Sequence, residues 1–574
     1  MLLVSRTDLI VVGIYMLLMV GVGIALSLFN KDDSDFFKSG NKMPWWLSGI
    51  SLFMSTFSVY TFTGAAGLAY RAPTVALLMY LINGVVILFS VLVLASRWRR
   101  SRADTVMSYL SERYGVSTNQ LYSWTHLGVA IVQGGIMLLA LGKFISVALG
   151  TDLSTTIIVC GLVISVYCLI GGLWAVVVTD TLQFMVLFPV ALVVLFLGIH
   201  EIGGISSLAS RAPQNFWAVE TQEFSWIFIM AYGVMMTFAM SSGAAAQRYF
   251  SVKDEKEARK VAIMTMVLLI VAPAIWLLPP ICTRILDIDL GPITAGLNAP
   301  QEAAYVAFCL KFLPTGAMGI MLAAMMAATM SSLSSSFNVY AAVITEDIIK
   351  QMFWKKATPK TLLLVGRIVT LLLGTLVIIA AIAQARVKGG VFVLMLTLSG
   401  VVIVPAGVPI IFGLIYRHTP RWAALASYLV GLSIGILYLL LGKEISFTEQ
   451  IFYVGSISAA IYFLPGLFIQ ARGEYKKRLD AFFTKLDTPV APEEVGDSER
   501  TDVGSFRITG WTTVGMGAAA LLLAFLDLPF KDRIINLSIS VLIMLIGAFL
   551  LIACNYAQQN KRARKFAAGP VKPL

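Results

Sequence analysis

The stretch ATMSSLSSSFNVY, residues 328–340, places five serines within six positions of a segment that is otherwise apolar enough for lipid. Hydroxyl groups in hydrocarbon are costly unless they find partners. On a helix, Ser331, Ser334 and Ser335 share one face, whereas Ser332 turns toward a neighbouring groove. Hydroxyl oxygens together with backbone carbonyls suit a hard monovalent cation, and the alternative is close helix packing through small residues. Five serines make a cation site competitive with packing.

The composition around this stretch is that of a membrane protein. Of the 574 residues, 58% are hydrophobic and 13% are charged, against about 25% charged in average soluble proteins. A bilayer core needs about 20 apolar residues per helix. The sequence offers about fifteen such segments, at 9–28, 45–70, 73–95, 121–149, 154–170, 174–199, 225–250, 261–282, 316–349, 361–385, 391–415, 423–441, 450–469, 510–528 and 534–556. We therefore predict an all-α polytopic membrane protein.

Basic residues are distributed unevenly between the two predicted sides. With the N-terminus outside, the inner segments include RWRRSR (97–102), KDEKEARK (253–260), KQMFWKKATPK (350–360) and KRARK (561–565). By this placement the inner side holds about three quarters of the Lys and Arg residues, as the positive-inside rule requires. We expect a multi-pass cell-membrane protein with its N-terminus outside and its C-terminus in the cytoplasm. The net charge of +12 then reflects topology beside anionic lipid and not a nucleic-acid site.

The order of spans predicts a repeated core with additions at both ends. Five spans followed by five more reverse their direction of entry, because five is odd, and this gives a 5+5 inverted repeat. The outer loop 283–315 is expected to hold a short helix at 300–312 that covers an outer vestibule. The expected parts are an N-terminal flanking helix in 1–30, a first repeat at 45–200, a second repeat at 225–417, two flanking helices at 420–470, a cytoplasmic linker at 471–509 with a flexible middle at 487–502, two C-terminal helices at 510–556 and a basic cytoplasmic tail at 557–574.

The first span of each repeat carries a polar, glycine-containing interruption. The two stretches are GISLFMSTFSVYTFTGAAGLAY (49–70) and AMSSGAAAQRY (239–249). Such interruptions favour unwound helix, which is tolerated at membrane depth where it lines a cavity, and its freed carbonyls can bind Na⁺. A broken first helix in each half is the pattern that points to a transporter site.

Asp180 is the clearest charge deep within a span. Such an aspartate costs about 2.5–3.5 kcal/mol at a helix centre and usually has a partner. No Lys or Arg is evidently placed to pair with it, so a cation site and a structural hydrogen bond both remain open.

The sequence contains no pattern of a cofactor enzyme. The five cysteines form no Cys/His cluster, and no phosphate-binding loop occurs. We expect no organic cofactor and no catalytic site. Cys282 and Cys309 fall near one long loop, where a disulfide and two free thiols are both open.

Several motifs, in this order along the chain, resemble the solute:sodium symporter family. They are DFFKSGNKMPWWLSGISLF (35–53), GLAYR (67–71), GGLWAVVVTDTLQ (171–183), QRYFSVKDEKEA (247–258), LAAMMAATMSSLSSSFNVYAAVITEDI (322–348) and GLIYRHTPRWAALA (413–426). The resemblance covers about residues 5–470. It implies a leucine-transporter-like fold with ten core helices and a symporter that couples a small organic solute to Na⁺.

The resemblance also implies sodium ligands. The common sodium site of the family would use the carbonyls of Met54, Phe57 and Ala328 and the hydroxyls of Ser331 and Ser332. A further sodium site, which some members have, would map to Asp180, Ser331, Ser334 and Ser335.

The solute is expected beside the two breaks, flanked by the third, fourth and eleventh spans. For each candidate the alternative is a bond to its own backbone, as Ser and Thr often make in membrane helices. The candidates are Thr56, Ser58, Thr61, Tyr80, Asn83, Gln133, Ser241, Ser242, Thr397 and Ser399.

Departures from the residues of known family members narrow the class of solute that we expect. The carboxylate-binding arginine of sialic-acid transporters falls at Val129, and the glutamine and asparagine of galactose transporters fall at Thr61 and near Ser242. With no cation in the predicted pocket, a neutral, hydroxyl-bearing, sugar-like solute is favoured. The alternative is a small carboxylate or an amino acid held at the broken-helix N-terminus of the seventh span.

Other functional classes remain open for the same fold. A ligand-sensing transceptor would need a separate partner, although the sequence indicates no required protein partner. An uncoupled facilitator would not need ion ligands, so the intact ligand positions argue against this class. A proton-coupled variant would use Asp180, whereas the full set of serines favours sodium.

Overall fold

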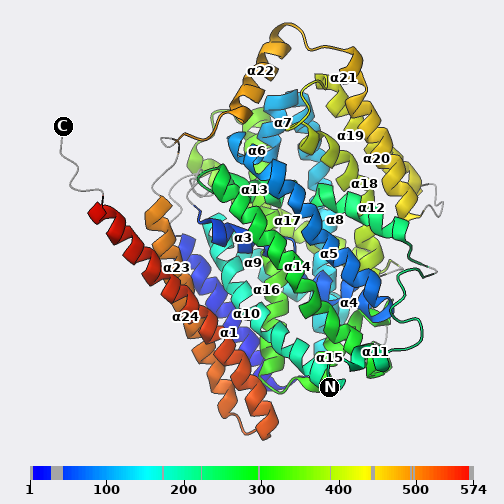
Figure 1. Cartoon of the computed structure of the whole chain (residues 1–574), viewed down its shortest axis with the longest axis vertical. Helices are drawn as coiled ribbons and strands as arrows, with labels where there is room; N and C mark the ends of the chain where they lie inside the picture. Colours follow the sequence, from blue (N-terminus) through cyan, green and yellow to red (C-terminus); the bar gives the residue numbers. More distant parts are fainter. Residues whose placement is uncertain are drawn as a thin grey trace.

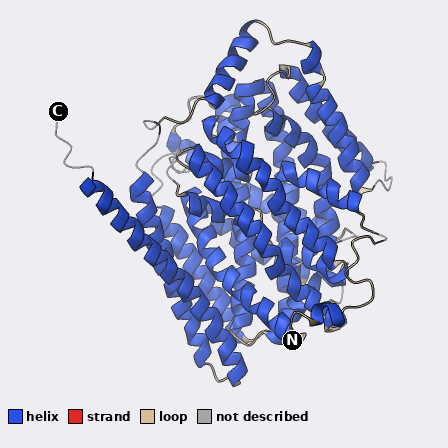
Figure 2. Cartoon of the chain, in the orientation of Figure 1, coloured by secondary structure: helices blue, strands red, loops and turns tan. Residues whose placement is uncertain are grey.

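The structure is a computed structural model that describes residues 4–27, 43–170, 173–221, 223–294, 298–387, 390–440, 446–491, 494 and 498–567. Within these ranges all regular structure is helical and no strand occurs (Figure 2). Eleven helices are long and apolar enough to cross a membrane, or up to thirteen if each of two bent pairs is one span. The all-α polytopic class is confirmed. Helices α1 (Arg6–Ser27) and α9 (Leu153–Ile170) occupy the two other predicted spans, so the count of about fifteen stays a prediction.

The helices of the first predicted repeat begin with a bent pair. They are α3 (Trp45–Ser55), η2 (Val59–Phe62) and α4 (Gly64–Arg71), then α5 (Pro73–Phe89), η3 (Ser90–Leu94) and α6 (Ala95–Arg100), then α8 (Val116–Leu149), α9 and α10 (Leu173–Glu201). The short helices α7 (Val106–Tyr114) and α11 (Ser207–Ser210) lie in the connections.

The second predicted repeat follows the same order. Its helices are α12 (Trp226–Ala239) with α13 (Ala244–Ser251), α14 (Glu255–Ile285), α16 (Ala317–Ala342) with the π-helical η6 (Val343–Phe353), α17 (Pro359–Gln384) and α18 (Gly390–Phe412). The predicted short helix at 300–312 is confirmed as η5 (Pro300–Ala303) and α15 (Ala304–Phe312), which follow η4 (Gly291–Ile293).

Contacts between the core helices occur in reciprocal pairs. Helix α3 packs against α10 and α14, and its counterpart α12 packs against α18 and α5. The contact of α10 with α16 corresponds to that of α18 with α8, and the contact of α8 with α17 corresponds to that of α16 with α9. Each contact is converted into its counterpart when every helix is replaced by the helix at the same place in the other repeat. An inverted repeat predicts this reciprocity.

Both predicted interruptions are real breaks in the helices. The axes of α3 and the η2–α4 segment differ by 51°, and those of α12 and α13 by 41°. Gly243, at the second break, has a φ of 53°, which L residues with a side chain rarely adopt. The breaks therefore release backbone groups from the helical ladder at the centre of the molecule.

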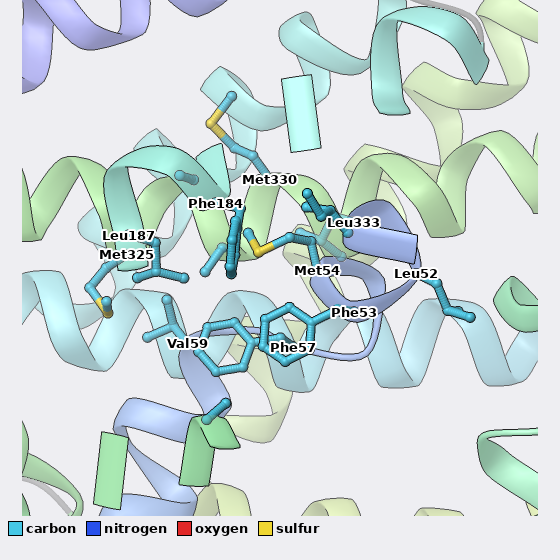
Figure 3. Packing of buried hydrophobic residues seen from close by; sticks show 14 of the residues in the cluster. Leu52, Phe53, Met54, Phe57, Val59, Phe184, Leu187, Met325, Met330 and Leu333 are labelled. Atoms are coloured by element: carbon cyan, nitrogen blue, oxygen red, sulfur yellow. The ribbon is translucent and has the colours of Figure 1, made fainter. Parts of the chain in front are cut away.

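Large apolar side chains fix the first break in place. Phe53 and Phe57 stack at 5.8 Å between ring centroids, and Phe57 lies 4.6 Å from Trp276 of α14. Figure 3 shows this cluster packing against α10 and α16 through Phe184, Leu187, Met325, Met330 and Leu333. The packing holds the irregular backbone of residues 55–58 in a defined position.

The flanking helices pack at two separate places on the core. Helix α1 packs against α16 and α10, and the hairpin of α23 (Ser498–Leu521), η8 (Leu522–Phe525) and α24 (Phe530–Ala567) packs against α10 (Figure 1). Helices α19 (Arg421–Leu440) and α20 (Phe447–Phe463), followed by α21 (Pro465–Phe468), pack against α18. Because α24 runs on to Ala567, most of the predicted tail at 557–574 is helical.

The predicted cytoplasmic linker at 471–509 contains a helix before its polar middle, and residues 498–509 belong to α23. Residues Gly473–Asp487 form helix α22, whose Leu479, Phe482 and Phe483 side chains are buried. The apolar residues recur at helical spacing, so the helix has a face to pack against α6 and α7. Polar composition hid this amphipathic pattern.

Two ends of the molecule can be distinguished in Figure 1. One carries α7 and α22, and the other carries α11 and α15. We call them the α7 end and the α15 end. The basic stretches 97–102 and 253–260 meet the 473–494 segment at the α7 end, where Arg100 bonds Glu255 and Arg102 bonds Glu494.

Candidate functional site

The first break and the serine helix α16 meet through Ser332. The Ser332 hydroxyl lies 3.4 Å from the carbonyl oxygen of Met54 and 3.2 Å from that of Ala328, and it also bonds the Phe57 carbonyl. Phe57 stands between the end of α3 and the start of η2, so its carbonyl is available. Three carbonyls and a hydroxyl thus converge on one buried point, a donor set that suits a small hard cation such as Na⁺.

Ser331, one position before Ser332 on α16, has a fully buried hydroxyl. This hydroxyl interacts with the Asp180 carboxylate and makes no closer hydrogen bond. Because buried polar groups are nearly always well paired, this loosely bonded oxygen fits a ligand for an ion. The residues assigned by resemblance to the common sodium site therefore lie together and fit a cation, although their role as ligands stays a proposal.

The expectation that Asp180 has no basic partner is wrong. Arg248 of α13 places Nη2 3.5 Å from Asp180 Oδ2, and both side chains are completely buried. Asp180 Oδ2 also accepts a hydrogen bond of 2.5 Å from Ser51 of α3, and the Ser331 hydroxyl interacts with the same carboxylate. The sequence signal was present, because Arg248 lies in the second interruption, but the two residues are 68 positions apart and their approach is a property of the fold.

Two residues of the predicted second sodium site, Asp180 and Ser335, contact Arg248. Ser335 accepts a hydrogen bond of 2.8 Å from Arg248 Nη2, and Ser55 accepts one of 3.1 Å. The Ser334 hydroxyl instead donates to the carbonyl of Ser331 in its own helix. A guanidinium therefore supplies positive charge where a second Na⁺ was expected, and that second site remains a proposal.

A cavity of about 310 Å³ adjoins the breaks. Its wall contains Ser55, which bonds Arg248, and Thr56, which follows α3. Eight of the ten predicted solute residues line it: Thr56, Ser58, Thr61, Tyr80, Asn83, Gln133, Ser242 and Ser399.

The other two solute predictions are not supported by the structure. Ser241 does not line this cavity, and its hydroxyl is 3.4 Å from that of Ser90. Thr397 lines a different cavity toward the α15 end, together with Arg71 and Glu223. Ser242 and Ser399, one and two positions away, do face the cavity near the breaks. The direction of each side chain at a break or on a helix decided the outcome.

Several cavity residues were not predicted from the sequence. Tyr60 and Tyr232 add hydroxyl-bearing aromatic rings, and His126 of α8 stacks near Tyr122 at 5.5 Å. Val129, where the resemblance places an arginine in sialic-acid transporters, is in the wall. Among the described lining residues Asp104 carries a formal charge, and no Lys or Arg is present.

The cavity extends to one end of the molecule. Its lining continues from the breaks to Asp104, Val106 and Met107 at the start of α7, and Asp104 is exposed. In this structure the cavity therefore opens toward the α7 end.

The comparisons with known proteins agree with this architecture. The model of the sodium:solute symporter family matches residues 36–431. The chain belongs to the sodium:solute symporter family. Membership identifies it as a membrane transporter with Na⁺ as the coupling ion, which is the ion that the α3–α16 donor set suits.

Curated relatives within the sodium:solute symporter family cover most of the chain. The human sodium/myo-inositol cotransporter 2 is 28% identical over 483 residues, which are 76% of this chain and 70% of that protein. The bovine sodium/mannose cotransporter is 27% identical and covers 76% of this chain and 79% of its own length. The sodium/glucose cotransporter of Vibrio parahaemolyticus is 24% identical, with coverage of 78% and 88%.

A solved structure shows the shared fold. A Na⁺-coupled sialic acid symporter, in a substrate-bound outward-open state, superposes with a TM-score of 0.70 at 21% identity. It covers 82% of this chain and 99% of its own. The leucine-transporter-like fold expected from the resemblance is thereby confirmed.

Proposed function

We propose that this sodium:solute symporter imports a small, neutral, hydroxylated solute of the sugar or polyol type by alternating access. The observation that carries the proposal is the position of the first break, which belongs to two sites. Its Met54 and Phe57 carbonyls face Ser332, and its Thr56 and Ser58 line the cavity. Any movement of the break therefore changes the ion site and the solute site together, which is the physical basis of coupling.

The chemistry of the cavity supports a neutral solute. Hydroxyl and amide groups alternate with aromatic rings and methionines, which suits a ring with hydroxyls at its edge. Asn83 Oδ1 is buried and has no partner, so it can accept a hydrogen bond from such a hydroxyl. The curated relatives that we compared are by name inositol, mannose and glucose cotransporters, and this agrees with the class.

The proposed orientation places the α7 end in the cytoplasm. The basic stretches 97–102 and 253–260 gather there, and the positive-inside rule assigns such segments to the cytoplasm. The α15 end, where α1 begins, would face the outside of a cell membrane. The cavity then faces inward, and the structure corresponds to the state that releases solute and Na⁺.

Transport by purified protein in liposomes tests the proposal. Labelled glucose, mannose, myo-inositol, small carboxylates and amino acids would be offered under an inward Na⁺ gradient and with choline instead. We expect uptake of a neutral polyol or sugar that needs Na⁺ and is lost in Ser332→Ala. Thr370→Ala is the matched control, because its buried hydroxyl donates to Gly366 within α17. Uptake that is equal in choline would contradict coupling, and uptake restricted to carboxylates or amino acids would favour the alternative solutes.

A further inference from the structure

A second buried ion pair lies at the α15 end, away from the ion and solute sites. Lys143 of α8 places Nζ 2.7 Å from Oε2 of Glu302 in η5, and the side chains are 6% and 3% exposed. Burying two charges is unfavourable unless both are well hydrogen-bonded. Lys143 and Glu302 are far apart in the sequence, so this pair joins two separate parts of the chain.

The same carboxylate also holds the start of α18. Glu302 Oε1 accepts hydrogen bonds from the N–H groups of Val391 at 2.7 Å and Phe392 at 3.4 Å. These are among the first N–H groups of α18, which have no partner within the helix. Gly390 is required here, because its φ is 77° and a Cβ would come within 2.5 Å of Glu302 Oε1.

A third core element lies against Glu302. A Cβ on Gly67 of α4 would come within 3.2 Å of Glu302 Cγ and of its backbone nitrogen. One side chain therefore touches α8 and α18 by hydrogen bonds and α4 by close packing. Nearby, Phe62 of η2 contacts Tyr305 of α15 at 4.7 Å, so the η5–α15 segment covers the first break as well.

These elements also form the walls of the solute cavity. Gln133 and Met137 come from α8, Leu396 from α18, and Thr61 from the η2–α4 segment. Met137 is six residues before Lys143, so it lies about 9 Å deeper along α8. Glu302 fills the space between α4, α8 and α18 on the α15 side of this cavity.

We propose that Glu302 and Lys143 form the outer closure of the transport cycle, made when the cavity faces the α7 end and broken when it faces the α15 end. The inference rests on the proposed function, because it assumes that both sides open in turn. While the pair is made, α18 and α4 are tied to α8 and the α15 end is shut. Opening that end exposes both charges to water, which solvates them separately.

The alternative is a permanent structural staple that keeps η5, α8 and α18 together throughout. The two ideas differ in what happens when the pair is weakened. If the pair is a closure that breaks during the cycle, weakening it shifts the population toward the state that is open at the α15 end. Loss of a staple loosens the protein without favouring either side.

Cysteine labelling at Met137 separates these ideas. Met137→Cys would be labelled with a membrane-impermeant methanethiosulfonate in intact cells and in inside-out vesicles, with and without Na⁺, against the wild-type background of five cysteines. Glu302→Gln would then be added, which keeps an acceptor for the Val391 N–H but removes the charge. We expect labelling from the α15 side to rise about tenfold and labelling from the α7 side to fall. The tenfold change corresponds to the loss of one charged hydrogen bond from the closed state.

Further variants make the test specific. Lys143→Met should shift labelling as Glu302→Gln does, and Lys143→Arg should restore the wild-type ratio. Glu201→Gln is the matched control, because Glu201 pairs with Lys531 at 2.9 Å at the same end but away from the three elements. If a single variant fails to fold, the Glu302→Gln/Lys143→Met double variant leaves no unpaired charge and carries the same expectation.

The outcomes that would overturn the closure differ from those that would overturn the proposed function. If labelling rises from both sides, or does not change from either side, the closure is overturned and the pair is a permanent structural contact. That comparison between variants needs neither solute nor Na⁺. Labelling of Met137→Cys alone that ignores Na⁺ would count against sodium coupling, and it would leave the comparison with Glu302→Gln decisive for the closure.

Discussion

Arg248 Nη2 lies 3.5 Å from Asp180 Oδ2, and both side chains have no exposed surface. The pair joins the second broken helix to α10, and Ser51 bridges them by donating to Asp180 and accepting from Arg248 Nε. A buried guanidinium therefore neutralises the carboxylate that resemblance assigns to a second sodium site. Arg248 and Na⁺ are competing partners for the same carboxylate.

Arg248→Met should lower the free energy of unfolding by about 3–5 kcal/mol, since it leaves a buried carboxylate unpaired. Thermal unfolding of detergent-purified protein measures the loss. If Asp180 is a sodium ligand, Na⁺ should stabilise Arg248→Met more than the wild type, because binding to the folded state raises its stability. Asp180→Asn in the same background should remove that extra gain. An equal Na⁺ effect in wild type and Arg248→Met would argue against the second site.

Ser331→Ala should separate stability from ion binding. Its buried hydroxyl interacts with Asp180 but makes no closer hydrogen bond, so removing it should leave the stability of the sodium-free protein nearly unchanged. The same change should raise the half-saturating Na⁺ concentration about tenfold, because one cation ligand is lost. Ser334→Ala is the comparison, since Ser334 donates to its own helix. A loss of stability in sodium-free buffer would show that the hydroxyl already has a structural partner.

Asn83→Ala should raise the KM for the solute by about tenfold or more while leaving the Na⁺ requirement intact. The reason is the unpaired Oδ1 in the cavity wall, which is expected to accept a solute hydroxyl. Ser241→Ala is a matched control, because Ser241 is equally polar and buried but does not line the cavity. Initial rates of uptake at saturating Na⁺ measure both. Equal KM values for the two variants would remove Asn83 from the solute site.

Asp8→Ala should destabilise the protein by about 1–3 kcal/mol through the serine helix. Asp8 of α1 is buried, and its Oδ1 accepts hydrogen bonds of 2.7 and 2.8 Å from the N–H groups of Gly316 and Gly319 at the start of α16. Asp8→Asn keeps an acceptor and should cost less. Asp532→Asn, also in the first turn of a helix, is the control. Thermal unfolding with equal losses for Asp8→Asn and Asp8→Ala would show that the acceptor contributes nothing.

Arg102→Ala should loosen α22 at the α7 end. Arg102 bonds both carboxylate oxygens of Glu494 and the backbone carbonyls of Lys485 and Pro489. Faster hydrogen exchange in Gly473–Asp487 would report the release, and the loss in stability should be at most about 1 kcal/mol because the pair is partly exposed. Unchanged exchange would mean that the buried face of α22 suffices.

The pH dependence of this contact follows from Glu494. Arg102 lowers the pKa of Glu494 to about 2, from about 4.3 in an unfolded chain. A lowered pKa in the folded state adds stability above the unfolded value, and that stability is lost as the pH falls toward 2. The protection from hydrogen exchange that this pair gives to α22 should therefore stay constant between pH 5 and 8. A midpoint within that range would contradict the assignment.

Much of the site could be predicted because it depends on local sequence. The serines of α16 and the interruption at 49–70 can be recognised from composition. The carbonyl oxygens of Met54 and Phe57 can serve as ligands whatever the side chains are. The family resemblance then joined the two segments, and Ser332 does meet both carbonyls. Eight of the ten predicted solute residues line the cavity beside the two breaks.

What the sequence could not predict depends on the direction of side chains and on distances in space. Thr397 and Ser399 lie two positions apart on α18, about 200° around the helix, so only one can face a given cavity. Ser241 and Ser242 sit at a break, where helical periodicity no longer sets the direction of side chains. The α22 helix was missed because its charged face dominates the composition of residues 473–487.

The sequence alone determined the membrane class, the positions of the apolar helices, the two breaks and the serine-rich face, because hydropathy and local conformation depend on neighbouring residues. The tertiary structure decided which distant groups meet. It paired Arg248 with Asp180, Glu302 with Lys143 and Asp8 with the start of α16. The physical reason is that a buried charge must find a partner, whereas the rotation and depth of each helix, set by packing of the whole core, determine which partner it finds.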